Sequence, residues 1–323
     1  MAGNSEQLQG DRRGLLAALL GDGRFLIIVT GLCLTLAGGF ALFQSATGHF
    51  LPHDIAYLGM TADELCSINE CRIVHFMFHD RVSFGGVLIA IGALYMWLAE
   101  FPLKMRAPWA WWTIAASGVI GFLSFLSYLG YGYLDSWHAV ATILLLPMFV
   151  AGLVRAKRTL GPPSAFGPAL RDGLRRNWTT RLGAGRLALL AAALGIVGAG
   201  LTISAIGMTS VFVPQDLAYM GLPADALHAI NPKLVPLIAH DRAGFGGGLC
   251  SGGIALLATI LFARPSRDLW EILAVIGVVG FSAAIGVHFT IGYTDPIHLA
   301  PACAGAALYA VGLALAFRPM MAA

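Results

Sequence analysis

Charged residues are scarce in this chain. Only 11% of its 323 residues are Asp, Glu, Lys or Arg, while 58% are hydrophobic, and the mean hydropathy is +0.76. A soluble globule of this size needs more polar surface than such a composition supplies. The composition therefore predicts an integral membrane protein, with the lipid bilayer as its first partner. The small net charge of +3 reflects loop charges and indicates no binding to nucleic acid.

Apolar runs of about 20 residues, each able to cross roughly 30 Å of hydrocarbon as a helix, recur along the chain. We place them at 25–46, 74–99, 108–131, 137–154, 187–212, 236–263, 270–292 and 297–317. Gly and Pro inside several runs do not argue against helix, because neighbouring membrane helices cover the freed backbone groups. The expected fold is an all-α integral membrane protein with eight transmembrane helices.

Basic residues are nearly absent from one side of these spans. That side keeps only Arg72 and Lys233 and carries most of the loop acids. By the positive-inside rule both termini are cytoplasmic, in a cell membrane of the inner, cytoplasmic or plasma type. The expected segments are a cytoplasmic tail at 1–23, a first four-helix unit at 24–154, a basic cytoplasmic linker at 155–186 and a second four-helix unit at 187–323.

Three motifs of the first unit return in the second. "LPHDIAYLGMTADELCSIN" at 51–69 resembles "VPQDLAYMGLPADALHAIN" at 213–231, "HDRVSFGG" at 79–86 resembles "HDRAGFGG" at 240–247, and "GYLDSWH" at 132–138 resembles "GYTDPIH" at 292–298. Because each unit has an even number of spans, both units enter and leave on the same side. We therefore predict two tandem parallel four-helix repeats, whose equivalent motifs lie at the same depth.

All nine histidines fall on the outer side of this topology, which indicates a shared layer of chemistry there. His79 and His240 lie one to two turns inside their spans, where polar groups are costly unless they pair or bind something. His138 and His298 open the fourth and eighth spans from the same side. Each unit thus offers one His from its second helix and one from its fourth. This arrangement suits ligation of a haem, haem b, through the pairs His79/His138 and His240/His298.

Other side chains near these histidines are candidates for the same haem site. They are His75, Arg81, Gly86, Asp135, Arg242, Gly247 and Asp295. The two glycines lie seven residues beyond a histidine, on the same helix face, and would leave a flat surface for a planar ligand. The two arginines would meet the propionates, and the two aspartates would orient imidazole N–H groups. His75, four residues before His79, shares a helix face with it.

Three other interpretations stay open. The first is a non-haem metal site made of His, Asp and the tyrosines Tyr133 and Tyr293. The second is a proton- or cation-coupled transporter that uses the layer of Asp80 and Asp241 with the adjoining histidines. The third is a structural protein without a cofactor. In that protein Arg81 would pair with Asp135, and Arg242 with Asp295, to join helices, and the Gly residues would be close helix contacts.

Five cysteines divide by location. Cys33, Cys250 and Cys303 sit in spans and are expected to pack as small apolar residues. Cys66 and Cys71 lie in the first outer loop, in a compartment that permits disulfides, so a bridge between them is a reasonable expectation.

The pattern of spans and histidines resembles the haem A synthase family. "VHFMFHDRVSFGGVLIAIGALYMWL" is similar to the family's second-span stretch, where a His-Arg pair leads into a Gly-containing apolar run. The resemblance implies eight spans in two four-helix halves, one His from each even-numbered helix, and a loop cysteine pair. The acidic residue that precedes the family's second-span His is missing here. We therefore take the resemblance for the fold and a haem site, and not for haem A synthesis.

The leading functional hypothesis is a haem-binding membrane oxidoreductase or electron carrier. A quinone or another redox protein would be its partner, because the histidine layer adjoins the boundary between lipid and water.

Overall fold

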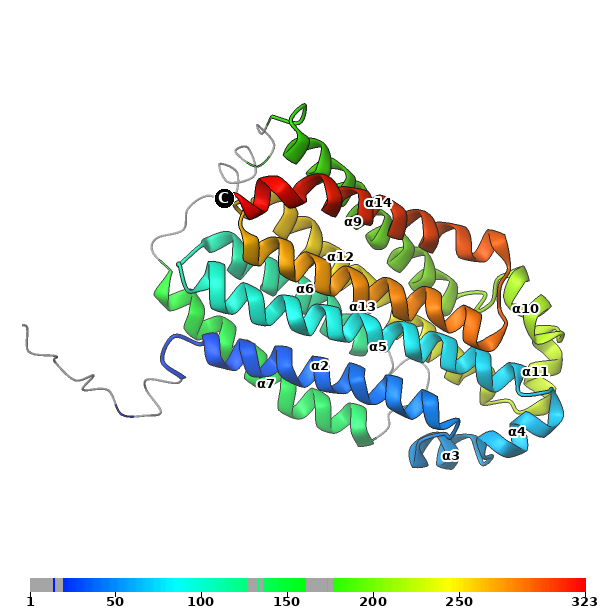
Figure 1. The fold of residues 1–323 in the computed structure, drawn as a ribbon. Helices are drawn as coiled ribbons and strands as arrows, with labels where there is room; N and C mark the ends of the chain where they lie inside the picture. The colour runs from blue at the N-terminus through cyan, green and yellow to red at the C-terminus, as the bar shows by residue number, and fades with distance from the viewer. Residues whose placement is uncertain (1–13, 15–19, 127–132, 134–135, 161–172, 174–176) are drawn as a thin grey trace, which may run out of the picture.

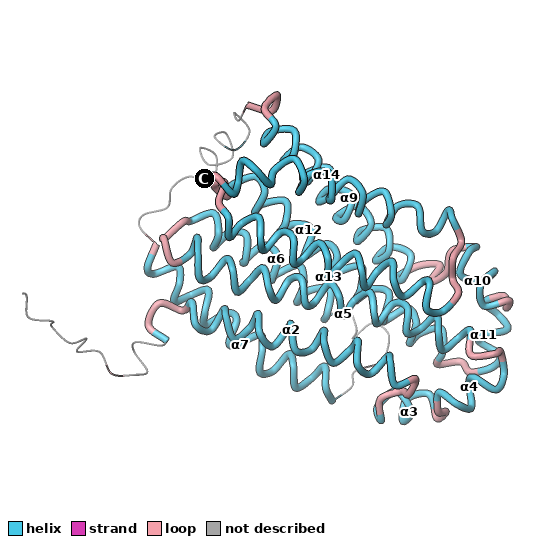
Figure 2. Tube along the Cα trace, viewed as in Figure 1, coloured by secondary structure: helices cyan, strands magenta, loops and turns pink. Residues whose placement is uncertain are grey.

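The computed structural model describes residues 14, 20–126, 133, 136–160, 173 and 177–323. These residues form a bundle of long helices that run up and down past one another, with no strand among them (Figures 1 and 2). Seven of the described helices are long and apolar enough to cross a membrane, at Arg24–Thr47, Arg72–Leu103, Ala139–Thr159, Arg181–Met208, Leu234–Phe262, Arg267–Ile291 and Pro296–Met321. The all-α membrane fold expected from composition is confirmed.

The long helices follow the apolar runs of the sequence closely. They are α2 (Arg24–Thr47), α5 (Arg72–Leu98), α6 (Pro108–Leu126), α7 (Ser136–Thr159), α9 (Arg181–Met208), α12 (Leu234–Phe262), α13 (Arg267–Ile291) and α14 (Pro296–Met321). A π-helical turn, η1 (Ala99–Leu103), extends α5. The linker is shorter than predicted, because α7 keeps Lys157 and Arg158 in its last turn, where cations complement the helix dipole.

Four short helices contain the duplicated motifs of 51–69 and 213–231. They are α3 (Pro52–Leu58), α4 (Ala62–Ile68), α10 (Pro214–Met220) and α11 (Ala224–Ile230). In α3 and α10 a proline occupies the first turn, where its missing N–H costs nothing. The aspartate two residues later accepts the backbone N–H of the residue before the helix. Gly59 and Gly221 end these helices at positive φ, 71° and 67°, which favours glycine.

The connection between α2 and α5 also contains a disulfide. Cys66 in α4 and Cys71, the residue before α5, are joined through their sulfurs. The bond ties the end of a short helix to the start of a membrane-spanning one.

Helices α5 and α12 form the centre of the bundle. More than half of the residues in each of these two spans are buried, against less than a third in every other candidate span. Each central helix packs against the first long helix of its own half, α5 on α2 and α12 on α9. Each also packs against a helix of the opposite half, α5 on α13 and α12 on α6. The two halves of the chain therefore interlock.

Glycines at the crossing points make this interlocking possible. A Cβ on Gly86 would overlap the side chain of Ala283 in α13, and one on Gly247 would overlap Ser124 in α6. Both glycines were predicted to face a planar ligand. That prediction is wrong, because the space in front of each glycine is filled by a helix of the other half, in the small-residue packing typical of membrane helices.

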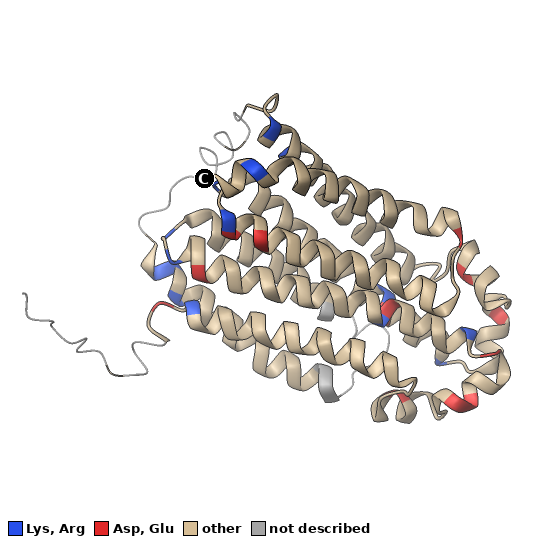
Figure 3. Cartoon of the chain, viewed as in Figure 1, with Lys and Arg blue, Asp and Glu red and all other residues tan. Residues whose placement is uncertain are grey.

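The two ends of the bundle differ in charge. The start of α2 and the end of α14 lie at one end, and the short helices α3, α4, α10 and α11 lie at the other, which we call the short-helix end (Figure 1). Lys and Arg gather at the first end, and acidic residues are spread over the short-helix end (Figure 3). A further group of charged residues lies within the length of the bundle, and it belongs to the candidate site.

Candidate functional site

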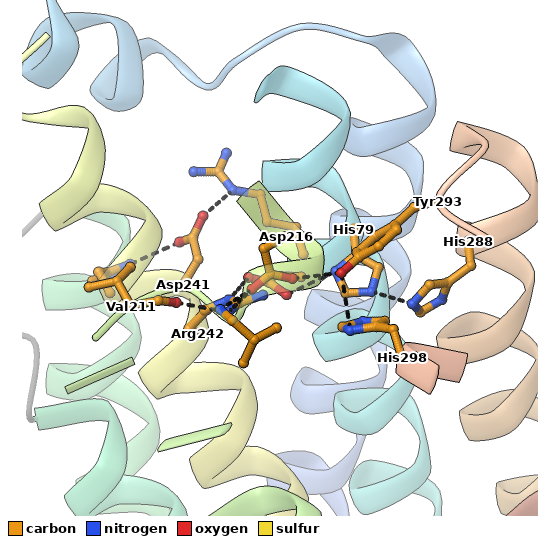
Figure 4. A network of polar contacts seen from close by, with 12 residues as sticks. His79, Val211, Asp216, Asp241, Arg242, His288, Tyr293 and His298 are labelled. Atoms are coloured by element: carbon orange, nitrogen blue, oxygen red, sulfur yellow. Dashed lines mark hydrogen bonds and ion pairs between the residues drawn. The ribbon is translucent and has the colours of Figure 1, made fainter. Parts of the chain in front are cut away.

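A layer of polar side chains crosses the bundle near the short-helix end (Figure 4). It is built on the two His-Asp-Arg runs, 79–81 in α5 and 240–242 in α12, each about two turns from its helix start. His79, Asp80, His240 and Arg242 are buried. Because buried charge without a partner is costly, the pairing of these groups decides what the layer can do.

The first arginine joins the two halves of the chain. Arg81 donates through Nη1 and Nη2 to the carboxylate of Asp54 in α3, at 2.6 and 3.1 Å. Its Nε donates to Asp241 in α12 at 2.8 Å. One guanidinium therefore holds one carboxylate of its own half and one of the other half.

The second arginine repeats this pattern in the opposite sense. Arg242 donates through Nη1 to Asp216 in α10 at 2.6 Å and to the carbonyl of Val211 at 2.8 Å. Its Nε donates to Asp80 in α5 at 3.1 Å. The duplicated run is thus a crossed pair of ion bridges between the halves.

The predicted ion pair between Arg242 and Asp295 is wrong. Asp295 is the N-cap of α14 and accepts the backbone N–H of His298 at 2.8 Å. Arg242 reaches Asp80 of the other half and Asp216 of its own half instead. Asp135, the predicted partner of Arg81, lies outside the described residues.

Both candidate tyrosines donate to the same outer carboxylates. The Tyr133 hydroxyl donates to Asp54 at 2.6 Å, and the Tyr293 hydroxyl donates to Asp216 at 2.8 Å. Burial raises the pKa of each tyrosine, and the neighbouring carboxylate raises it further. Both side chains therefore stay protonated donors.

Three histidines converge beside this network. His79 of α5, His288 of α13 and His298 of α14 each offer a ring nitrogen, and these three atoms lie within 4.8 Å of one another. The Nε2 atoms of His79 and His288 are 2.9 Å apart. His79 and His288 are buried and His298 is half-buried. Such a cluster has the residue types and spacing of a transition-metal site.

The second ring nitrogen of each histidine fixes its tautomer. Nδ1 of His79 faces Asp80 at 3.0 Å and Nδ1 of His288 faces the Ala284 carbonyl at 2.7 Å. Both partners accept, so both Nδ1 atoms must donate. Nδ1 of His298 lies 3.1 Å from the Tyr293 hydroxyl, which has already given its proton to Asp216 and so accepts. With neutral rings, the Nε2 lone pairs of His79 and His288 then face each other.

The charges of the layer also leave room for a cation. Its carboxylates are Asp54, Asp80, Asp216 and Asp241, and its guanidiniums are Arg81 and Arg242. Four negative and two positive charges sum to −2. A single divalent cation held by three neutral imidazoles would bring the sum to zero, which low-dielectric surroundings favour.

The remaining predicted histidines lie apart from this cluster. His240 bonds through Nδ1 to Asp241 at 2.9 Å and meets the Tyr133 ring edge-on, with centroids 4.7 Å apart. His75 is partly exposed and contributes no nitrogen to the cluster. The side chain of His138 lies outside the described residues. The predicted pairing of His298 with His240 is wrong, since His298 lies beside His79 of the other half.

His288 is the site residue that sequence reasoning missed. The offset of 160 residues that relates "GYTDPIH" to "GYLDSWH" places Tyr128 at the equivalent position of the first unit. A search restricted to duplicated residues therefore passes over it. The available signal was that the second unit has a histidine where the first unit has Tyr128.

The described residues leave no space for a haem between His79 and His298. The His288 ring stands 4.3 Å from the His79 ring and 5.2 Å from the His298 ring, in the space where a porphyrin between these two would lie. The cavity beside His240 has a volume of about 150 Å³, whereas pockets for molecules of drug size measure roughly 300–1,000 Å³. The predicted His79/His138 pair lies partly outside the described residues, so haem ligation there stays a prediction.

Acid is expected to weaken the Asp54 bridge. Burial alone would raise the pKa of Asp54, but the Arg81 guanidinium and the Tyr133 hydroxyl outweigh it and lower the pKa from 3.8 to about 2. Ionised Asp54 therefore contributes roughly 2–3 kcal/mol of stability above pH 4, which is lost as the pH falls towards 2. Thermal unfolding in detergent at pH 5 and pH 3 measures this. Asp54→Asn should flatten the difference, whereas the exposed Asp63→Asn should not.

Comparison with protein-family models, with curated proteins and with solved structures finds no match for this chain.

Proposed function

We propose that this chain is a membrane metalloprotein with redox or electron-transfer chemistry. It binds one divalent transition-metal ion through His79, His288 and His298. In this proposal the chain crosses a cell membrane eight times as two parallel four-helix repeats, with α6 as the third span. Both termini are cytoplasmic and the short-helix end is outside.

One observation carries the proposal: a ring nitrogen from each of the three histidines lies within 4.8 Å of the others, and each Nδ1 has a hydrogen-bond partner. The Nε2 atoms of His79 and His288 are 2.9 Å apart, and two lone pairs at that distance repel each other unless a cation or a proton lies between or beside them. Histidines that hold metals show the same division of labour, with one nitrogen on the ion and the other on a carboxylate, a carbonyl or another fixed group.

The ligand set favours particular ions. Imidazole suits zinc, copper, iron and nickel, whereas calcium and magnesium prefer oxygen. Three neutral nitrogen ligands leave a coordination position open for a small molecule. A bound ion of this group would supply Lewis acidity and, for copper or iron, one-electron redox chemistry.

The chain's own residues orient and shield the ligands. Asp80 holds the orientation of the His79 ring, and the Ala284 carbonyl does the same for His288. Tyr293 stacks on His298 with centroids 4.5 Å apart and planes at 28°. Phe76 stacks on the other side of the site, 6.1 Å from His79, and keeps water from that ring.

A proton shared between histidines would also satisfy the converging lone pairs, and it would support the proton-coupled transporter. Metal analysis separates the two. Protein purified in detergent without chelator should contain about one equivalent of a transition metal, which excess chelator removes. A spectrum without a Soret band distinguishes this centre from haem b. Metal-free protein that takes up no zinc, copper or iron on titration would contradict the proposal.

A further inference from the structure

A second cavity lies inside the bundle among α5, α9, α12, α13 and α14. Its volume is about 110 Å³, and its walls include Val87, Ile91, Gly252, Gly280 and Ala284. None of the described residues that line it is exposed. The lining residues are buried or half-buried, and the cavity is partly open at its rim, so that apolar molecules can enter it from the membrane interior.

The walls of this cavity are apolar. Tyr309 carries the one polar side chain among the described lining residues, and its hydroxyl donates to the Leu273 carbonyl at 2.7 Å. A buried water needs two to four polar partners, whereas a dry apolar cavity of about 150 Å³ can hold benzene or xenon. This space is somewhat smaller, so it suits a small apolar molecule.

The cavity reaches the candidate metal centre through α13. Ala284 lines it, and the Ala284 carbonyl accepts the hydrogen bond from Nδ1 of His288. The two residues are one helical turn apart, about 6 Å along the axis. On α5, Val87 lines the cavity two turns beyond His79. One end of the cavity, at Ala284, thus lies one helical turn from His288.

We propose that this cavity binds dioxygen from the membrane interior and supplies it to the metal. The supply of dioxygen to the metal rests on the proposed function, whereas the binding of dioxygen rests on the cavity alone. Dioxygen is apolar, diatomic and more soluble in hydrocarbon than in water. Copper and non-haem iron are the protein-bound ions that use it. The open coordination position would receive it.

Gly280 provides a clean way to fill the cavity. A Cβ at Gly280 meets nothing within 4 Å, so Gly280→Ala and Gly280→Leu should occupy the space in steps without disturbing the helices. Gly286 lies on the same helix, also meets nothing within 4 Å, and does not line the cavity. Gly286→Leu is therefore the matched control.

Binding is tested by methyl relaxation in nanodiscs under oxygen pressure, since dioxygen is paramagnetic. The Ile91 and Ile276 methyls, which line the cavity, should relax several-fold faster than those of Ile114, which is equally buried but elsewhere. Gly280→Leu should abolish the enhancement and Gly286→Leu should retain it. Equal relaxation at all three isoleucines in the wild type would overturn the binding.

Supply is tested on copper-loaded protein reduced with dithionite and mixed with dioxygen. Each reduced ion gives one electron to dioxygen, which leaves as superoxide, and the recovered Cu(II) signal measures the rate. Gly280→Leu should slow this rate several-fold, Gly280→Ala should slow it less, and Gly286→Leu should leave it unchanged. Oxygen-dependent relaxation with an unaltered rate in Gly280→Leu would overturn the supply. Protein that binds no metal would overturn the proposed function and the supply, while the relaxation result would still decide the cavity.

Discussion

Arg242→Met is expected to lower the free energy of unfolding by about 3–5 kcal/mol, the usual cost of removing one partner of a buried ion pair. The substitution keeps most of the side-chain volume but leaves Asp80 and Asp216 facing each other without a cation, and both are almost fully buried. The measurement is the yield of monodisperse protein, followed by its unfolding in a mild denaturing detergent.

Two further variants make this result specific. Adding Asp80→Asn and Asp216→Asn to Arg242→Met should recover much of the loss, because no buried charge then lacks a partner. Arg267→Met removes an exposed pair with Glu271 and should cost less than about 1 kcal/mol. If Arg242→Met is no worse than Arg267→Met, the crossed bridges do not hold the two halves together.

His79→Ala is expected to abolish metal binding, whereas His240→Ala should retain it. The two residues occupy equivalent positions of the duplicated motif, but His79 meets His288 and His298, while the described contacts of His240 are with Asp241 and Tyr133. The measurement is metal content after purification and affinity by titration of the stripped protein. The equivalent position makes His240→Ala a control matched in residue type, depth and neighbouring aspartate.

Tyr293→Phe refines the same test. It removes the acceptor of the His298 Nδ1–H and should weaken metal binding by about 10–100-fold without eliminating it, as is typical for a residue that orients a ligand. Equal losses from His79→Ala and His240→Ala would contradict a single three-histidine centre and would favour one site in each half.

The sequence identified many residues of the polar layer but few of their hydrogen-bond and ion-pair partners. Arg81, Arg242, Tyr133 and Tyr293 were identified from the duplication and all lie in the network. Their partners Asp54 and Asp216 were recognised only as repeated loop residues, because nothing in the sequence shows that the short helices fold back over the centre. His288 was missed because the site breaks the repeat there.

The amino-acid sequence alone determined the helices and their local starts and ends. The length of each continuous apolar segment decides whether it can cross the membrane. That length is a property of contiguous residues and can be read from the sequence. The Pro, Asp and Gly of each outer motif decide where α3 and α10 begin and end for the same reason. The depth of the His-Asp-Arg runs also follows from counting along each span.

Only the tertiary structure decided which side chains meet. From the sequence, Gly86 and Gly247 could form a surface for a planar ligand or a helix contact. The packing of α13 and α6 against them shows that they form helix contacts. The same packing carries His288 and His298 to His79, so that a residue of the first half completes a cluster of the second. The contact between His79 and His288, more than 200 residues apart, depends on which helices with similar apolar faces pack side by side. The periodicity of residues along one helix does not specify its packing partner, because the partner is determined by the fit of small and large side chains over whole helix surfaces.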